Sequence, residues 1–330
     1  MAVRKFNSLL GLAFIPLTIG VIPGCASHSA VPAIGPQPAL DATTFTSFDG
    51  DRFSYQRWVP KRSPRLVVIG FHGIAGASTD LRILGEYLLD HLPRTAIYAP
   101  DLRGQGLDPI ATRRGDIRDR HDWYNDAYTF TRLVRARHPG ARVVWCGESM
   151  GSLIALHAAA AAPGEALPCD ALILSSPIAR IQDGFPGWRR TALRLGAFLF
   201  PRHRISLESL SGQHEVQVIK GVVHEEQVET NPYHLSAFTL RLLYTLGNMI
   251  ETLPEGPAQI DLPVLLLHGG HDVFSKPADV AAFQRNFPPD APVQRAFYPE
   301  SYHLLFYDHQ RENVLTDITR WLRKIKASPP

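Results

Sequence analysis

Short apolar segments alternate with helical patterns through most of this chain. Five segments have the length and composition of buried strands, at residues 66–71, 95–98, 142–146, 171–175 and 264–267. Helical patterns lie between them at 79–91, 123–138 and 151–162, and a last strand and helix are expected at 293–297 and 314–326. This alternation predicts a parallel sheet covered by helices on both faces, with the ligand site at the carboxyl ends of the strands.

One hydroxyl group stands between two glycines where the strand at 142–146 meets the following helix, in Gly147-Glu148-Ser149-Met150-Gly151. A strand turns into a helix within about one residue only if the central residue is strained and its flanking positions lack side chains. Such a turn exposes the serine oxygen next to the amino end of a helix. The pattern occurs by chance in about one chain in ten of this length. The prediction that Ser149 is a nucleophile therefore depends on its partners.

A serine hydroxyl becomes a good nucleophile when a base takes its proton and an acid orients that base. Asp272 lies in a glycine-rich loop shortly after the strand at 264–267, and His303 follows the strand at 293–297. We expect Asp272 and His303 to be the acid and the base. Asp308 and Glu300 are alternative acids, but neither follows a strand as Asp272 does.

A tetrahedral intermediate also needs backbone N–H donors. We expect these donors to be Met150, directly after the nucleophile, and Ile74, in the glycine-rich stretch after the strand at 66–71. His268 and His271 flank the predicted acid, but a third ligand at metal spacing does not accompany them. We therefore expect neither a metal nor another cofactor.

The chain resembles the monoacylglycerol lipase and lysophospholipase branch of the α/β-hydrolases, also described as serine aminopeptidase-like. The matching pieces are His72-Gly73 with Gly76, PDLRGQG at 100–106, GESMG at 147–151, PVLLLHGGHD at 263–272 and YPESYHLLFYD at 298–308. Their spacing covers nearly everything from 44 to 326, and the order serine, aspartate, histidine is that of α/β-hydrolases. The chain departs from the family where it lacks a second histidine after His72.

This resemblance implies an α/β-hydrolase fold with a mostly parallel, eight-stranded sheet. The core is expected at 43–177 and 261–330, with a helical cap inserted at 178–260, where we find no plausible sheet strand. A separate second domain is a weaker interpretation, because the strand pattern resumes directly after residue 260. The implied activity is hydrolysis of carboxylic esters, with single-chain lipids as substrates, either monoacylglycerol or lysophospholipid.

The predicted cap carries one segment suited to lipid. Its apolar side chains are expected to shelter an acyl chain: Trp188, Leu195, Phe198, Leu199 and Phe200. Its arginines either meet anionic headgroups or form a solvated helix face: Arg189, Arg190, Arg194, Arg202 and Arg204.

The first 24 residues have the pattern of a signal peptide, with Arg4-Lys5 followed by an apolar run that is too short to span a bilayer. The run ends at Cys25 in a sequence that resembles a bacterial lipobox, although Pro23 stands where alanine or serine is usual. We expect Cys25 to be lipidated and residues 25–42 to form a tether. Ala26, rather than an aspartate, follows the cysteine and favours the outer membrane, facing the periplasm. Ordinary signal cleavage is the alternative, although His28 and Ala30 fit it badly.

The net charge indicates which partners the chain can bind, and the cysteine positions indicate whether it forms a disulfide. Removal of residues 1–24 lowers the formal net charge from +3 to +1, which argues against nucleic-acid binding. Cys146 and Cys169 are expected at opposite ends of neighbouring strands, too far apart for a disulfide, and hence as buried free thiols. The partners that we expect are a small-molecule or lipid ester and a membrane.

Two other functions stay open. An aminopeptidase-type amidase would keep the same three residues but would need a carboxylate for a free amino terminus. A non-catalytic binding scaffold would be expected to lose one of the three, and this chain keeps them. Among other polar residues, we expect Arg103 to brace its own loop and Asp122 and Asp126 to cap and solvate the helix that follows.

Overall fold

The computed structural model describes residues 36–162, 167–180, 187–206, 217–219, 222–223 and 233–327, all within the unit formed by residues 35–330. A central sheet of nine strands runs in the order β1-β2-β3-β5-β4-β6-β7-β12-β13. Its strands are β1 (Ala39–Leu40), β2 (Thr44–Thr46), β3 (Arg52–Trp58), β4 (Leu66–Phe71), β5 (Thr95–Pro100), β6 (Arg142–Glu148), β7 (Ala171–Ser175), β12 (Val264–Gly269) and β13 (Val293–Tyr298).

The predicted α/β class is confirmed, but the prediction of eight strands is wrong by one. The additional strand is β1, which pairs antiparallel with β2 and lies inside the segment expected to be a tether. Antiparallel pairing continues through β2, β3 and β5. From β5 to β13 all neighbours are parallel, so their carboxyl ends meet at one edge of the sheet.

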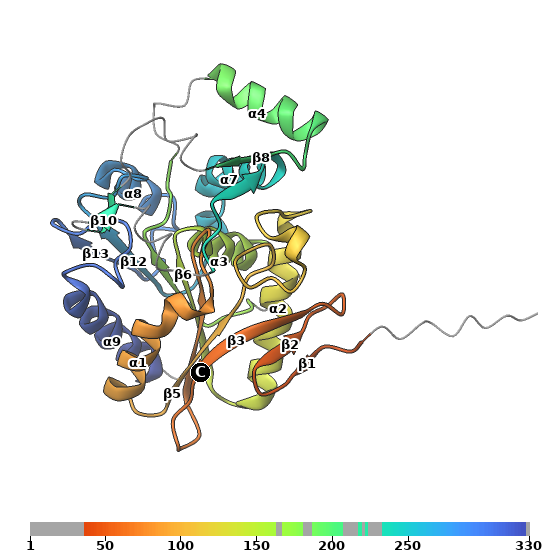
Figure 1. Cartoon of the computed structure of the whole chain (residues 1–330). Helices are drawn as coiled ribbons and strands as arrows, with labels where there is room; N and C mark the ends of the chain where they lie inside the picture. The colour runs from red at the N-terminus through yellow and green to blue at the C-terminus, as the bar shows by residue number, and fades with distance from the viewer. Residues whose placement is uncertain are drawn as a thin grey trace, which may run out of the picture. The chain divides into compact units, whose positions relative to one another are not determined.

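Helices cover both faces of the sheet (Figure 1). The main helices are α1 (Arg82–His91), α2 (Arg120–Arg137), α3 (Met150–Ala160), α4 (Gly187–Leu199), α7 (Leu240–Thr252), α8 (Pro277–Gln284) and α9 (Arg311–Ala327). Short 3₁₀ turns are η1 (Ser78–Leu81), η2 (Ala111–Arg113), η3 (Leu253–Glu255) and η4 (Pro257–Gln259). Asp119 caps the amino end of α2, because its carboxylate accepts the N–H of His121, so the expectation that Asp122 and Asp126 cap this helix is wrong.

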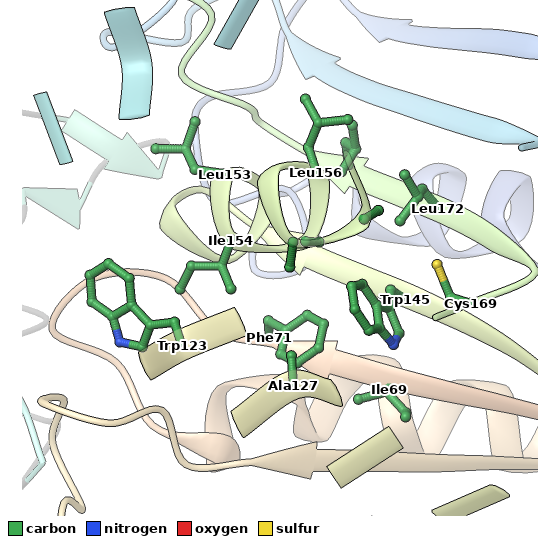
Figure 2. Close-up of a cluster of buried hydrophobic side chains, with 14 of the residues drawn as sticks. Ile69, Phe71, Trp123, Ala127, Trp145, Leu153, Ile154, Leu156, Cys169 and Leu172 are labelled. Atoms are coloured by element: carbon green, nitrogen blue, oxygen red, sulfur yellow. The ribbon is translucent and has the colours of Figure 1, made fainter. Parts of the chain in front are cut away.

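Alternate residues of each central strand enter one of two apolar clusters, because successive side chains of a strand point to opposite faces. Val143 and Trp145 of β6 join the cluster under α2 and α3, whereas Val144 and Cys146 join the cluster under α1 and α9. Figure 2 shows the first cluster, with Leu153, Ile154 and Leu156 of α3 packed over the sheet. Burial on both faces explains why these strands read as continuous apolar runs.

The two cysteines are free and buried, as predicted. Cys146 lies in β6 and Cys169 lies just before β7. Burial in these apolar surroundings raises the pKa of both thiols, so both stay protonated.

The described part of residues 178–260 adds no strand to the central sheet, but it is not purely helical as expected. The strand β8 (Arg204–Ser206) pairs antiparallel with β11 (Ala237–Thr239), and β9 (Gln217–Ile219) pairs with β10 (Val222–Val223). We call 178–260 the cap. Arg241 of α7 forms an ion pair with Asp116 of the core, and Thr239 donates a hydrogen bond to the same carboxylate. These contacts join β11 and α7 to the core.

Candidate active site

Ser149 lies at a sharp strand-to-helix turn, between β6 and α3. Its φ of 53° and ψ of −114° are strained for a residue with a side chain. A Cβ atom at Gly147 would lie 2.3 Å from the carbonyl oxygen of Gly151, and one at Gly151 would lie 2.0 Å from that of Phe71. Both glycines are therefore sterically required, as the motif predicts.

Backbone and hydroxyl groups of neighbouring residues hold this turn in place. The N–H of Ser149 donates to the carbonyl of Ser175 at the end of β7, at 2.9 Å. The hydroxyl of Ser152 lies 2.8 Å from the carbonyl oxygen of Gly147 and 2.9 Å from that of Ser175. These contacts satisfy groups that the strained turn would otherwise leave unpaired.

His303 and Asp272 form a buried pair in the loops after β13 and β12. Nδ1 of His303 lies 2.9 Å from Oδ2 of Asp272, and the two residues are 3% and 6% exposed. An ionised carboxylate can only accept, so Nδ1 carries the proton and Nε2 is left as the basic atom. The other carboxylate oxygen accepts the N–H groups of Phe274 and Ser275, which fixes its orientation.

The pKa of Asp272 is lower than its ordinary value although burial alone would raise it, because the charge and hydrogen bond of His303 outweigh that burial. The N–H of Phe274 lowers it further. The carboxylate therefore stays ionised at neutral pH and is able to stabilise a positive charge on His303.

Ser175, the last residue of β7, and Ser176, which follows it, connect the serine turn to the histidine loop. Ser175 accepts the N–H of Ser149, and the hydroxyl of Ser176 donates to the carbonyl of His303 at 2.6 Å. Ser176 has a φ of 47°, an uncommon value for a residue with a side chain. The ring of Phe274 packs edge-on against His303, with centroids 4.6 Å apart. The structure thus places Ser149, Asp272 and His303 on neighbouring loops of one sheet edge.

The predicted oxyanion donors lie on either side of the serine. Met150 is the first residue of α3, and Ile74 lies in the loop after β4. Within the described part of the chain, neither of their N–H groups has a hydrogen-bond partner. A Cβ atom at Gly73 would lie 3.6 Å from Cβ of Ser149, so this loop passes directly beside the nucleophile.

The alternative acids lie elsewhere. Asp308 accepts hydrogen bonds from the hydroxyl of Ser301 and from the N–H groups of Tyr302 and Gln310, which accounts for its burial. Glu300 is exposed and lies 3.9 Å from His271. These contacts assign Asp308 to the support of its loop.

No group of three or more metal-ligating side chains is found among the described residues. His268 is buried, and its Nε2 lies 3.0 Å from the carbonyl oxygen of Ser275. His271 stacks on Tyr302, with centroids 5.2 Å apart. Both histidines therefore have structural contacts.

Sequence reasoning missed Ser152, Ser176 and Gln105. The sequence offers one indication of their roles: Ser152 and Ser176 come soon after predicted strands, and Gln105 lies in the matched stretch 100–106. The side chain of Gln105 accepts the N–H of Ala75 at 2.9 Å, one residue from the predicted donor Ile74.

The apolar side chains expected to shelter an acyl chain are exposed instead. Trp188, Leu195, Phe198, Leu199 and Phe200 on and after α4 are 54–81% exposed. Arg190 of α4 pairs with Glu251 of α7 at 3.2 Å, while Arg194 and Arg202 are also exposed. The result is an apolar surface with basic residues on the described part of the cap.

The N-terminal predictions concern residues outside the described ranges, namely the signal peptide at 1–24, Cys25 and the first part of the tether. Within the described ranges, the structure contains no helix with the length and apolar character needed to cross a membrane.

Three comparisons relate this site and fold to known proteins. A family model described as serine aminopeptidase, S33, matches residues 62–310. A monoacylglycerol lipase from Mycolicibacterium smegmatis is 27% identical over 284 residues, which cover 84% of this chain and 95% of that protein.

Solved structures share the fold. A soluble variant of monoglyceride lipase from Saccharomyces cerevisiae, in complex with a substrate analogue, has a TM-score of 0.73 at 21% identity, covering 90% of this chain and all of that one. A carboxyl esterase from Bacillus coagulans, in complex with glycerol, has a TM-score of 0.69 at 18% identity, covering 88% of this chain and 99% of that one.

Proposed function

The chain belongs to the serine aminopeptidase family of α/β-hydrolases, and on that premise we propose that it is a serine hydrolase that cleaves carboxylic esters of single-chain lipids. The observation that carries this proposal is the His303–Asp272 pair at the same edge of the sheet as a serine in a strained turn. The predicted family and fold are confirmed by the matching residues 62–310 and by the shared architecture.

In the proposed reaction, Oγ of Ser149 attacks the ester carbonyl while Nε2 of His303 takes its proton. The N–H groups of Ile74 and Met150 stabilise the oxyanion. His303 then returns the proton to the leaving alcohol, which leaves an acyl group on Ser149. A water molecule, activated by the same histidine, releases the fatty acid. Asp272 stabilises the imidazolium in both half-reactions.

Two observations support a lipid substrate. The M. smegmatis relative named monoacylglycerol lipase aligns over nearly its whole length. The apolar side chains on α4 are exposed where a micelle or a membrane would meet them, with Arg194 and Arg202 nearby. We therefore favour monoacylglycerol or lysophospholipid over triglycerides and peptides.

A substrate panel tests this proposal on purified protein. It contains p-nitrophenyl esters of increasing chain length, monoacylglycerol, lysophospholipid and an aminoacyl amide. We expect KM to fall as the acyl chain grows, because each buried methylene contributes about 0.8 kcal/mol. A dominant amidase rate would favour the aminopeptidase alternative instead. A steep preference for acetyl esters would contradict the lipid substrate.

Ser149→Ala tests the nucleophile separately. The change removes one oxygen atom from a turn that keeps its glycines, so the fold should survive while hydrolysis and labelling by a fluorophosphonate probe are lost. The circular dichroism spectrum and Tm are the control. Equal labelling of the variant and the wild type would refute the assignment.

We also propose that the enzyme is anchored in the bacterial envelope through a lipid on Cys25, facing the periplasm. Support comes from the sequence of residues 1–25 alone. Cys25→Ala should release the enzyme from the membrane fraction or block its processing. An unchanged distribution between membrane and soluble fractions would refute this anchor.

A further inference from the structure

A second loop braces the loop that carries Ile74. Residues 72–76 follow β4 and residues 101–106 follow β5, its parallel neighbour. Three hydrogen bonds join them: Ala75 N–H to Oε1 of Gln105 (2.9 Å), Leu102 N–H to Nε2 of His72 (3.0 Å), and Gly106 N–H to the carbonyl of Gly76 (3.3 Å). Burial lowers the pKa of His72 to about 4, so this histidine stays neutral and able to accept.

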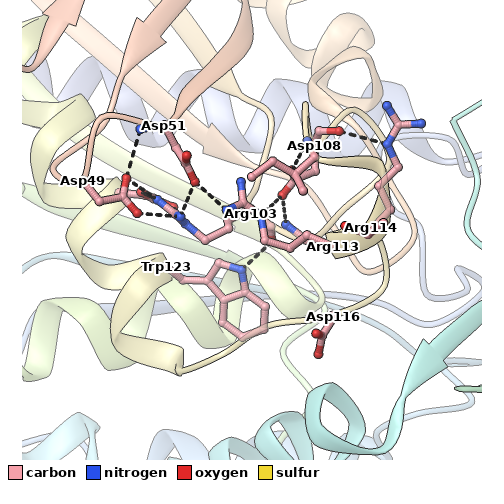
Figure 3. Close-up of polar contacts among 12 residues, drawn as sticks. Asp49, Asp51, Arg103, Asp108, Arg113, Arg114, Asp116 and Trp123 are labelled. Atoms are coloured by element: carbon pink, nitrogen blue, oxygen red, sulfur yellow. Dashed lines mark hydrogen bonds and ion pairs between the residues drawn. The ribbon is translucent and has the colours of Figure 1, made fainter. Parts of the chain in front are cut away.

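The bracing loop is itself held rigidly. Arg103 donates to the carboxylates of Asp49, Asp51 and Asp126, each at 2.8 Å, and its side chain is only 3% exposed (Figure 3). The indole N–H of Trp123 donates to the carbonyl of Arg103. Arg103 therefore fixes the backbone from which Gln105 projects.

The amide of Gln105 has a defined orientation. The residue is fully buried, and only its oxygen can accept the N–H of Ala75. Its Nε2 then faces no acceptor among the described residues.

The turn that Gln105 contacts holds an alanine at a position that favours glycine. Gly76 N–H donates to the carbonyl of Gly73 at 3.3 Å, which makes residues 73–76 a β-turn with Ile74 and Ala75 at its centre. Ala75 has a φ of 64°, the sign required by a type II turn, in which glycine is usual at this position. A type I turn would suit alanine better, but it would rotate the Ile74–Ala75 peptide and turn the N–H of Ala75 away from Gln105.

We propose that Gln105 is a positioning residue for the oxyanion hole. Its Oε1 holds the 73–76 turn in the type II state and so fixes the backbone of Ile74, whose N–H is the predicted oxyanion donor. This inference rests on the proposed function, because it gives Ile74 its role in the reaction.

Gln105→Met tests the inference, because methionine keeps the volume and loses the acceptor. We expect kcat on a p-nitrophenyl ester to fall by about 10- to 100-fold with KM within about twofold, since the lost interaction acts on the transition state. The rate of fluorophosphonate labelling should fall by a similar factor.

Ala75→Gly in the same background is the decisive variant. Glycine adopts a positive φ at no steric cost, so it should keep the type II turn without Gln105 and restore at least about tenfold of the lost kcat. Ala75→Gly alone should behave like the wild type. A purely structural loss would not be restored by this change.

Two results would overturn the inference: a wild-type labelling rate in Gln105→Met, or a loss that Ala75→Gly does not restore. If Gln105→Met does not fold, Gln105→Asn replaces it, because the shorter side chain withdraws the acceptor, with the same expectations. Failure of the proposed function looks different, because the wild-type protein itself would then show no labelling that depends on Ser149.

Discussion

Nδ1 of His303 and Oδ2 of Asp272 lie 2.9 Å apart although the two residues are 31 positions apart in the sequence. Parallel pairing of β12 with β13 brings their loops together. The register His268↔Phe297 and Gly269↔Tyr298 aligns the strand ends from which both loops leave. The sheet register thus brings the acid and the base together, and hydrogen bonds within the loop of Asp272 orient its carboxylate.

Asp272→Asn should lower kcat by about four orders of magnitude, because an amide favours the wrong tautomer of His303. Asp308→Asn is the matched control. Its carboxylate accepts two backbone N–H groups and one hydroxyl, so this change should lower the free energy of unfolding by about 1–3 kcal/mol and leave kcat nearly unchanged. The opposite pattern of kcat values would make Asp308 the acid.

Gly151→Ala should abolish activity and lower stability, since its Cβ would lie 2.0 Å from the carbonyl oxygen of Phe71. Gly247→Ala offers a control in the interior of α7, where, among the described residues, no atom beyond the adjacent residues and the backbone of this helix lies within 4 Å of the new Cβ. Alanine is the better helix former, so this control should gain up to about 1 kcal/mol. Thermal unfolding and ester hydrolysis measure both effects. Equal Tm values for the two variants would contradict the steric argument.

Glu148 should make stability dependent on pH. Burial, with a smaller contribution from the charge of Asp80, raises the pKa of Glu148 from 4.5 to about 8. An acid with a raised pKa in the folded state contributes stability that is present below the unfolded pKa and lost as pH rises through the folded one. Glu148→Gln should therefore gain stability relative to the wild type between pH 4.5 and about 8.

Chemical denaturation at pH 5, 7 and 9 measures this difference. A difference in unfolding free energy that fails to grow with pH would show that Glu148 is ionised in the folded protein.

Arg103→Met should lower the free energy of unfolding by about 3–5 kcal/mol, because it leaves the buried carboxylate of Asp126 without its charged partner. Arg82→Met removes an exposed pair with Glu86 and should cost at most about 1 kcal/mol. Denaturant titration compares the two. A similar small cost for both variants would show that the Arg103 network is not a stabilising brace.

The sequence predicts the sheet well where burial on both faces leaves an apolar run. Leu66–Phe71 and Ala171–Ser175 have the expected bounds, and β6, β12 and β13 extend beyond theirs by one or two residues. The first strand of the sheet is harder to predict, because Ala39–Leu40 is too short to show the alternation of apolar and polar residues that marks a strand.

Long-range polar contacts escape prediction for a different reason. From the sequence, Asp126 is expected to be a solvated helix residue, and only the packing of α2 brings it into contact with Arg103. No sequence pattern around Gln105 indicates that Ala75 is its partner. The strands β8 and β11 are three residues each and are separated by a long segment. Only tertiary structure brings such pairs together.

The pairing of β8 with β11 forms a small sheet that is separate from the central sheet. It closes the segment between Ser206 and Ala237 at its base, and Thr239 and Arg241 join that base to the core through Asp116. Closing a longer loop costs little, about 0.6 kcal/mol for each doubling of length. A change in the length of this segment should therefore cost little stability, because the strands at its base and the central sheet keep their own contacts.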